Sequence, residues 1–173
     1  MNDTTVSTVR VYCGTYKKYN EGSLFGEWID VENFRDKDDF LDYCTKLHSD
    51  ESDPELMFQD HEGIPEAFIG ESWIAEELWE YLSEIDEDDR PAFEAYCNNG
   101  YKPADALSSF RDDFNGYWNS ELEFAEHMAG EAGYYKAMED AGLNVAYFDN
   151  EAFARDLFYD YWRDDESGAV FTR

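Results

Sequence analysis

The sequence predicts an α+β protein with strands toward both ends and helices in the middle. Three features of the chain favour this fold class. β-branched and aromatic residues fill the N-terminal stretch TVRVYCGTY, apolar residues recur at helical spacing in the central third, and the chain closes on GAVFTR. With 173 residues, 43% of them hydrophobic and 18% aromatic, the chain can bury a core that offsets its conformational entropy.

The N-terminal third predicts a small sheet with one covering helix. TVRVYCGTY and the short stretch EWIDV are typical of paired strands, because a glycine-bearing loop separates them. PELMFQDHEGIP returns as a strand, which its own glycine and proline end. Between them DKDDFLDYCTKLH predicts a helix. The apolar residues on one face of this helix are Phe40, Leu41, Cys44 and Leu47.

The central third predicts three helices. Ser72 is the expected N-cap of a helix that runs to Ile85, a length of about 21 Å. Its apolar seam consists of Ile74, Leu78, Leu82 and Ile85. A second helix follows over RPAFEAYCNNG, with its proline in the first turn and its glycine as the stop. Pro103 opens a third helix, which carries Leu107, Phe110 and Phe114.

The C-terminal third mixes helices and strands. Ser120 and Glu123 predict a capping box for a helix that carries Ala125, Met128 and Ala129. NVAYFD is expected to form a strand, and GAVFTR closes the chain as another. Between these two, NEAFARDLFYDYW predicts a helix on which Phe153, Leu157 and Tyr161 follow each other at steps of four.

The charge of the chain is strongly and unevenly negative. The 42 acidic and 13 basic residues give a formal net charge of -29, far more than solubility requires. Between Lys46 and Lys102 there are 17 acidic residues and a single cation, Arg90. Such a surface repels nucleic acid and anionic membranes and attracts basic proteins. We therefore expect a cationic protein partner, and neither nucleic acid nor a membrane.

Compartment and cofactor chemistry are constrained mainly by what the sequence lacks. Three widely spaced cysteines (Cys13, Cys44 and Cys97) predict neither a disulfide framework nor a zinc site, and they fit a reducing cytoplasm. The start MNDTTVSTVRVYCG does not resemble an export signal, and no 18-residue apolar stretch predicts a membrane span. The phosphate-binding, dinucleotide-binding and hydrolase motifs are missing, so we expect no cofactor and no enzymatic activity.

A metal site is not expected either. The three histidines (His48, His61 and His127) follow no ligand spacing, so we interpret them as ordinary surface or polar-core residues. A calcium loop centred on Gly116 fails, because Arg111 and Leu122 occupy its first and last ligand positions. A hydrolase that uses two carboxylates stays an alternative, but no pair among the 42 is singled out. A salt-adapted globular protein is a second alternative.

The spacing of the carboxylates favours mimicry of DNA. Along about 21 Å, one DNA strand carries about six phosphates, and the predicted helix from Ser72 to Ile85 carries four carboxylates. The net charge of -29 equals that of about 49 Å of duplex. The candidate contact residues are Glu76, Glu77, Glu80, Glu84, Asp86, Glu87, Asp88, Asp89, Asp112 and Asp113.

Most of the chain resembles the ArdA family of antirestriction proteins. The resemblance is carried by VYCGTYKKYNEGSLFGEWID near the N-terminus, by AYFDNEAFARDLFYDYW with GAVFTR near the C-terminus, and by the shorter HEGIP. It implies an elongated protein of three domains, which we place at residues 1–66 (α+β), 67–115 (acidic and helical) and 116–173 (α+β). The eight residues before Val9 differ from the usual family start.

The resemblance also implies a function and an oligomeric state. Members of the family imitate DNA and occupy the DNA-binding groove of type I restriction-modification enzymes, usually as homodimers joined through the C-terminal region. The residues that this assigns to the dimer contact are Tyr147, Phe148, Phe153, Leu157 and Tyr161. An intramolecular core role for Phe153, Leu157 and Tyr161 is an equally good interpretation of the same residues.

Overall fold

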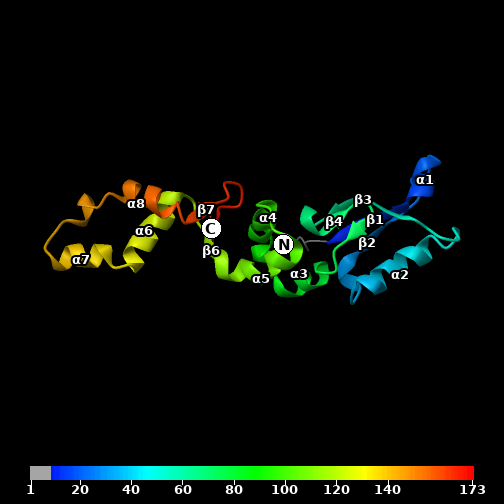
Figure 1. Ribbon diagram of the computed structural model, residues 1–173, viewed down its shortest axis with the longest axis horizontal. Coiled ribbons are helices and arrows are strands. Elements are labelled where there is room, and N and C mark those ends of the chain that lie inside the picture. Colours follow the sequence, from blue (N-terminus) through cyan, green and yellow to red (C-terminus); the bar gives the residue numbers. More distant parts are fainter. Residues whose placement is uncertain (1–8) are drawn as a thin grey trace, which may run out of the picture. The chain divides into compact units, whose positions relative to one another are not determined.

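The computed structural model describes residues 9–173 and confirms the α+β class. The chain forms two compact units, one that ends at Ser108 and a second that comprises Ser109–Arg173. Figure 1 labels the elements of each unit. The division into three domains at residues 66 and 115 stays a prediction, and the polar tail before Val9 lies outside the described residues.

The first unit combines a small sheet with several short helices. Its elements are β1 (Arg10–Thr15), α1 (Tyr16–Asn20), β2 (Glu27–Asp30), η1 (Val31–Asn33), α2 (Lys37–Leu47), β3 (Leu56–Glu62), η2 (Glu66–Phe68), β4 (Ile69–Gly70), β5 (Trp73–Ile74), α3 (Leu78–Glu84), η3 (Glu87–Asp89) and α4 (Arg90–Asn98), where η marks a 3-10 helix. The next helix, α5 (Pro103–Asp113), crosses the division between the units after Ser108.

The predicted N-terminal sheet with one covering helix is confirmed. Its antiparallel strands lie in the order β2-β1-β3, with Val11 opposite Ile29 on one side and opposite His61 on the other. Helix α2 lies along the sheet (Figure 1). Its Phe40 is fully buried, and the Phe40 and Phe58 ring centroids are 5.9 Å apart. Burial of these aromatic rings joins helix and sheet into one core.

The helices α3 and α4 pack around a separate aromatic cluster in the same unit. Phe68, Tyr81 and Phe93 are buried there, with ring centroids 5.1 to 5.9 Å apart. A tryptophan links this layer to the segment between η1 and α2, because Trp79 Nε1 donates a hydrogen bond of 3.1 Å to the carbonyl oxygen of Phe34. Both contacts lie within the first unit.

The prediction of a helix from Ser72 to Ile85 was wrong in its extent. The helix observed is α3, Leu78–Glu84, about 10 Å long. Before it, β4 and β5 form a hairpin in which Ile69 pairs with Ile74, and Ser72 lies in the turn rather than at an N-cap. Ile74 is buried from a strand, yet it precedes Leu78 by four residues, so it imitated helical periodicity.

The second unit is built from a three-stranded sheet and three helices. Its elements after α5 are β6 (Phe114–Tyr117), α6 (Glu121–Glu131), α7 (Tyr134–Asp140), η4 (Val145–Tyr147), α8 (Asn150–Leu157), β7 (Tyr161–Arg163) and β8 (Ala169–Thr172). The strands are antiparallel in the order β6-β8-β7. Phe171 of the central strand is buried between Phe114 and Trp162, whose ring centroids lie 5.6 and 4.4 Å away.

Several boundaries in the second unit differ from the prediction. NVAYFD does not form a strand, because Asn144 caps the 3-10 helix η4 by accepting a hydrogen bond from the amide of Ala146. The helix predicted through Tyr161 ends at Leu157, and Tyr161 starts strand β7. Phe114 belongs to strand β6 instead of the helix that Pro103 opens. The Ser120 cap is confirmed, since the Glu123 amide donates to Ser120 Oγ, but the Glu123 carboxylate accepts from the amide of Asn119 instead of Ser120, so the capping box is incomplete.

Candidate functional site

The candidate carboxylates occupy short elements and the turns between them. Glu76 and Glu77 precede α3, Glu80 and Glu84 lie on it, and Asp86 precedes η3. Glu87, Asp88 and Asp89 form η3 itself. Asp112 and Asp113 end α5 in the second unit, so the ten residues do not share one unit. The four charges that were expected on a single rigid helix therefore lie on two short segments, the turn before α3 and α3 itself.

Most of these side chains are solvent-exposed. The exposed ones are Glu76, Glu80, Glu84, Asp86, Glu87, Asp88 and Asp112, and the half-buried ones are Glu77, Asp89 and Asp113. In the described part of the chain, no ion pair involves Glu76, Glu77, Glu80, Asp86, Glu87, Asp89 or Asp112. Their negative charge is available to a partner rather than neutralised within the fold.

Buried apolar side chains hold this acidic segment in place. Leu78, Tyr81 and Ile85 are at most 4% exposed. Burying one such side chain contributes about 1.5 to 3 kcal/mol, whereas the like-charge pair Glu80 and Glu84 costs only about 0.2 to 0.5 kcal/mol. The same burial raises the pKa of the Tyr81 hydroxyl to about 12. The scaffold under the carboxylates is thus strong enough to keep them at fixed positions.

Arg90 is the single cation between Lys46 and Lys102, and its side chain points into the protein. Its side chain is 12% exposed, its Nη2 lies 3.7 Å from Glu32 Oε1, and its guanidinium lies 5.8 Å from the centre of the Tyr81 ring. Its Nε and Nη1 atoms are buried and have no hydrogen-bond partner among residues 9–173. The sequence contained no indication of this orientation. Because Arg90 points inward, the surface charge of the segment from Glu76 to Asp89 is almost wholly negative.

Other basic residues likewise form ion pairs with carboxylates of the same fold. Lys18 Nζ contacts Asp50 and Glu51 at 2.9 and 2.8 Å, and Arg10 Nε lies 2.7 Å from Glu62 Oε2. A hydrogen bond from the partnering cation holds the pKa of each of these three carboxyl groups below its usual value. The acidic excess is nevertheless so large that neutralising one carboxylate with every Lys and Arg would leave a charge of -29.

Comparison with known proteins decides the family. A family model described as "Antirestriction protein (ArdA)" matches residues 11–169. The chain belongs to the ArdA family of antirestriction proteins. The resemblance noted in the sequence is confirmed, and the match spans both compact units. No curated protein matches the chain.

The histidines and cysteines of this ArdA chain occupy ordinary structural positions. His48 is fully buried and bonds to the Cys13 carbonyl oxygen, and the His127 ring packs at a tilt against Trp118 with ring centroids 4.8 Å apart. Residues 9–173 contain no group of three potential metal ligands, and the three cysteines are free and buried. Within the same residues no helix combines the length and apolarity that a membrane span requires.

The residues assigned to the ArdA dimer contact fall into two groups. Phe148 and Phe153 pack on each other and on Tyr134 with ring centroids 5.5 to 5.6 Å apart, and Tyr161 lies 5.1 Å from Phe124. The rings of Phe148, Phe153 and Tyr161 and the side chain of Leu157 are half-buried, so they pack within the second unit and still present part of their surface, and both interpretations of them stay open. Tyr147 differs, because it is 83% exposed.

Proposed function

We propose that this ArdA protein is a DNA mimic that competitively occupies the DNA-binding groove of type I restriction-modification enzymes. It acts as an inhibitor in the cytoplasm and catalyses no reaction. The observation that carries this proposal is the set of exposed carboxylates at Glu76, Glu80, Asp86 and Glu87, which form no ion pair with any residue of the described chain. Their charges would occupy lysine and arginine sites that otherwise hold phosphates.

Replacement of one long helix by short segments changes the form of the mimicry but keeps its physical basis. The charges no longer follow one straight line of about 21 Å. They instead stand on α3, on η3 and on the turns that precede them. Because a buried apolar core fixes these segments, little ordering is needed on binding. Asp112 and Asp113 would contribute negative charge on the second unit itself.

We also propose a homodimer that joins two copies through the C-terminal unit. Tyr147 is the best candidate for a direct contact, since Leu143 near it is also exposed and neither side chain contributes to the core. A dimer would double the charge presented to an enzyme whose DNA sites are bipartite. By charge alone, two copies would match about 98 Å of duplex.

The test is complex formation with a purified type I methyltransferase core at increasing salt. Affinity should fall as salt rises, since exposed charges are screened over about 8 to 10 Å at physiological ionic strength. Joint replacement of Glu76, Glu77, Glu80 and Glu84 by glutamine should weaken binding far more than the same replacement of Glu21, Glu55, Glu66 and Glu131. Equal losses in the two quadruple variants would refute a role for the α3 segment.

A further inference from the structure

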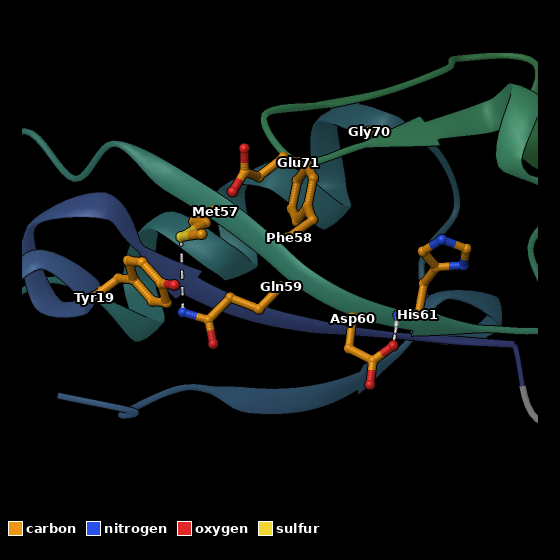
Figure 2. A pocket seen from close by; sticks show the side chains of 8 residues that line it. All are labelled: Tyr19, Met57, Phe58, Gln59, Asp60, His61, Gly70 and Glu71. Carbon is orange, nitrogen blue, oxygen red and sulfur yellow. Dashed lines mark hydrogen bonds between the residues drawn. The ribbon is translucent and has the colours of Figure 1, made fainter. Parts of the chain in front are cut away.

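A pocket at the edge of the N-terminal sheet lies apart from the candidate carboxylates. It has a volume of about 490 Å³ and is lined by Tyr19, Met57, Phe58, Gln59, Asp60, His61, Gly70 and Glu71. It follows the edge of β3 that does not pair with β1, since the sheet order places β3 outermost. Figure 2 shows Tyr19 and the Gln59 amide toward one end, with Asp60 and His61 toward the other.

The backbone fixes the walls of this pocket. The Phe58 amide donates a hydrogen bond of 2.7 Å to the carbonyl oxygen of Glu71, which anchors the β4-β5 turn beside β3. On β1, Gly14 leaves room for the Gln59 side chain, because a Cβ there would lie 2.6 Å from Gln59 Nε2. The amide of Gln59 and the carboxylate of Glu71 are therefore presented by two neighbouring, backbone-anchored segments.

The lining combines an exposed aromatic ring with uncompensated negative charge. The Tyr19 side chain is 52% exposed. Asp60 and Glu71 are exposed, and neither forms an ion pair with any residue of the described chain. Asp60 Oδ1 accepts a hydrogen bond of 2.8 Å from the amide of His61. This contact orients the Asp60 carboxylate and leaves its charge in place.

The same sheet already holds one guanidinium with this combination of groups. The Arg10 guanidinium lies 4.6 Å from the centre of the Trp28 ring. It donates two hydrogen bonds to Glu62, of 2.7 and 3.1 Å. An aromatic face and a bidentate carboxylate are the two features that favour arginine over lysine. The pocket offers both features without an internal cation to use them.

We propose that this pocket binds an arginine side chain of the partner enzyme. The Tyr19 ring would stack on the guanidinium, Glu71 would accept two of its hydrogen bonds, and the Gln59 carbonyl oxygen would accept another. Asp60 would add attraction at the far end of the pocket. This inference rests on the proposed function for the identity of the partner, but it adds a specific site to a surface that otherwise acts by distributed charge.

The first test uses the protein alone and the probe N-acetyl-arginine methylamide. Addition of the probe should shift the NMR signals of the Gln59 side-chain amide and the Tyr19 ring. The lysine counterpart should bind several-fold more weakly, because its ammonium cannot form the bidentate pair. Glu71→Gln and Tyr19→Ser should each weaken binding of the arginine probe about tenfold. Glu66→Gln is the matched control, since Glu66 is exposed, is in the same unit and does not line the pocket.

The second test measures binding of the same variants to the methyltransferase core. Glu71→Gln and Tyr19→Ser should weaken that complex, while Glu66→Gln should leave it nearly unchanged. Equal probe shifts for arginine and lysine, or equal effects of Glu71→Gln and Glu66→Gln, would overturn the pocket assignment while leaving competition with DNA intact. Specific probe binding by a protein that forms no complex with the enzyme would instead overturn the identity of the partner and the proposed function together.

Discussion

Lys18 illustrates how single basic residues are used in this acidic protein. Its ammonium contacts Asp50, Glu51 and Nδ1 of His48 at 2.8 to 3.2 Å. Because an ammonium can only donate, Nδ1 must accept, and the proton of His48 stands on Nε2, where it bonds to the Cys13 carbonyl oxygen. One side chain thereby ties α1 and β1 to the chain that follows α2.

Replacement of Lys18 by methionine should lower the thermal stability of the first unit by several degrees. The change removes one hydrogen-bond partner each from the buried His48 and from Glu51, whose side chain is 7% exposed, and losing a partner at such positions costs more stability than losing an exposed charge. Lys17→Met is the control, because Lys17 is exposed and next in sequence. Differential scanning calorimetry distinguishes the two variants, and equal melting temperatures would show that the network contributes nothing.

The pair of Arg10 and Glu62 should give a pH-dependent contribution to stability. Its hydrogen bond to Arg10 lowers the pKa of Glu62 from the usual 4.5, so the stabilisation is present above that value and is lost as pH falls through the lowered pKa. The stability difference between the wild type and Glu62→Gln should therefore shrink below pH 4.5. Urea unfolding of both proteins at pH 7 and at acidic pH measures this difference in stability. A difference that is the same at both pH values would show that the ion pair with Arg10 does not stabilise the fold.

At the scale of elements, the acidic segment depends on the packing of α3. Leu78 is fully buried and starts the helix, so its side chain sets where the neighbouring carboxylates stand. The sequence predicted the burial of Leu78 and Ile85 correctly, but it missed the buried Tyr81 and the start of the helix, and Leu82 is only half-buried. A strand residue, Ile74, buried in the same unit, satisfied the same four-residue spacing. Periodicity reports which side chains are buried, and it does not distinguish a short hairpin from an added helical turn.

Leu78→Ala should destabilise the first unit by about 2 to 5 kcal/mol through lost burial and a residual cavity. Leu24→Ala removes the same atoms from a side chain that is 74% exposed, and it should change stability by less than about 0.5 kcal/mol. Urea unfolding followed by tryptophan fluorescence makes the comparison. Similar midpoints for the two variants would mean that α3 is not anchored as described.

Local chemistry made other elements predictable. Ser120 and Glu123 marked the start of α6, and the proline of RPAFEAYCNNG marked the first turn of α4, because these residues satisfy or spare unpaired backbone amides. The strand predicted for NVAYFD was wrong because the prediction gave more weight to its β-branched and aromatic residues than to Asn144. The Asn144 side chain accepts a hydrogen bond from the amide two residues further on and starts η4. The orientation of Arg90 depends on Glu32, which is distant in sequence, so no local pattern could reveal it.

In the second unit, dimerisation and folding should respond to different aromatic residues. Tyr147→Ser should weaken self-association about tenfold or more without unfolding the chain, since this side chain is 83% exposed. Phe153→Ala should instead destabilise the unit by about 1 to 3 kcal/mol, because its half-buried ring packs on Phe148 and Tyr134. Sedimentation velocity with circular dichroism separates the two effects. A Tyr147→Ser chain that associates as tightly as the wild type would remove Tyr147 from the proposed contact.

At the scale of the whole molecule, the acidic excess is a property of many residues at once. Composition and the interval between Lys46 and Lys102 predicted it directly from the sequence, whereas the exposure and lack of ion pairs at particular carboxylates required the structure. Because the α3 segment is expected to act by distributed charge, Glu80→Gln alone should change binding to the enzyme only slightly, unlike Glu71→Gln in the pocket. A catalytic carboxylate would behave differently, since its replacement abolishes activity while the fold persists.

The central claim is that this protein and DNA occupy the same site on the enzyme. The most direct measurement is the apparent dissociation constant of the protein for a type I methyltransferase core at increasing concentrations of duplex that carries the recognition site. The account predicts that this constant rises in proportion to the DNA concentration, with no complex that holds both. A ternary complex, or a dissociation constant that DNA leaves unchanged, would contradict it.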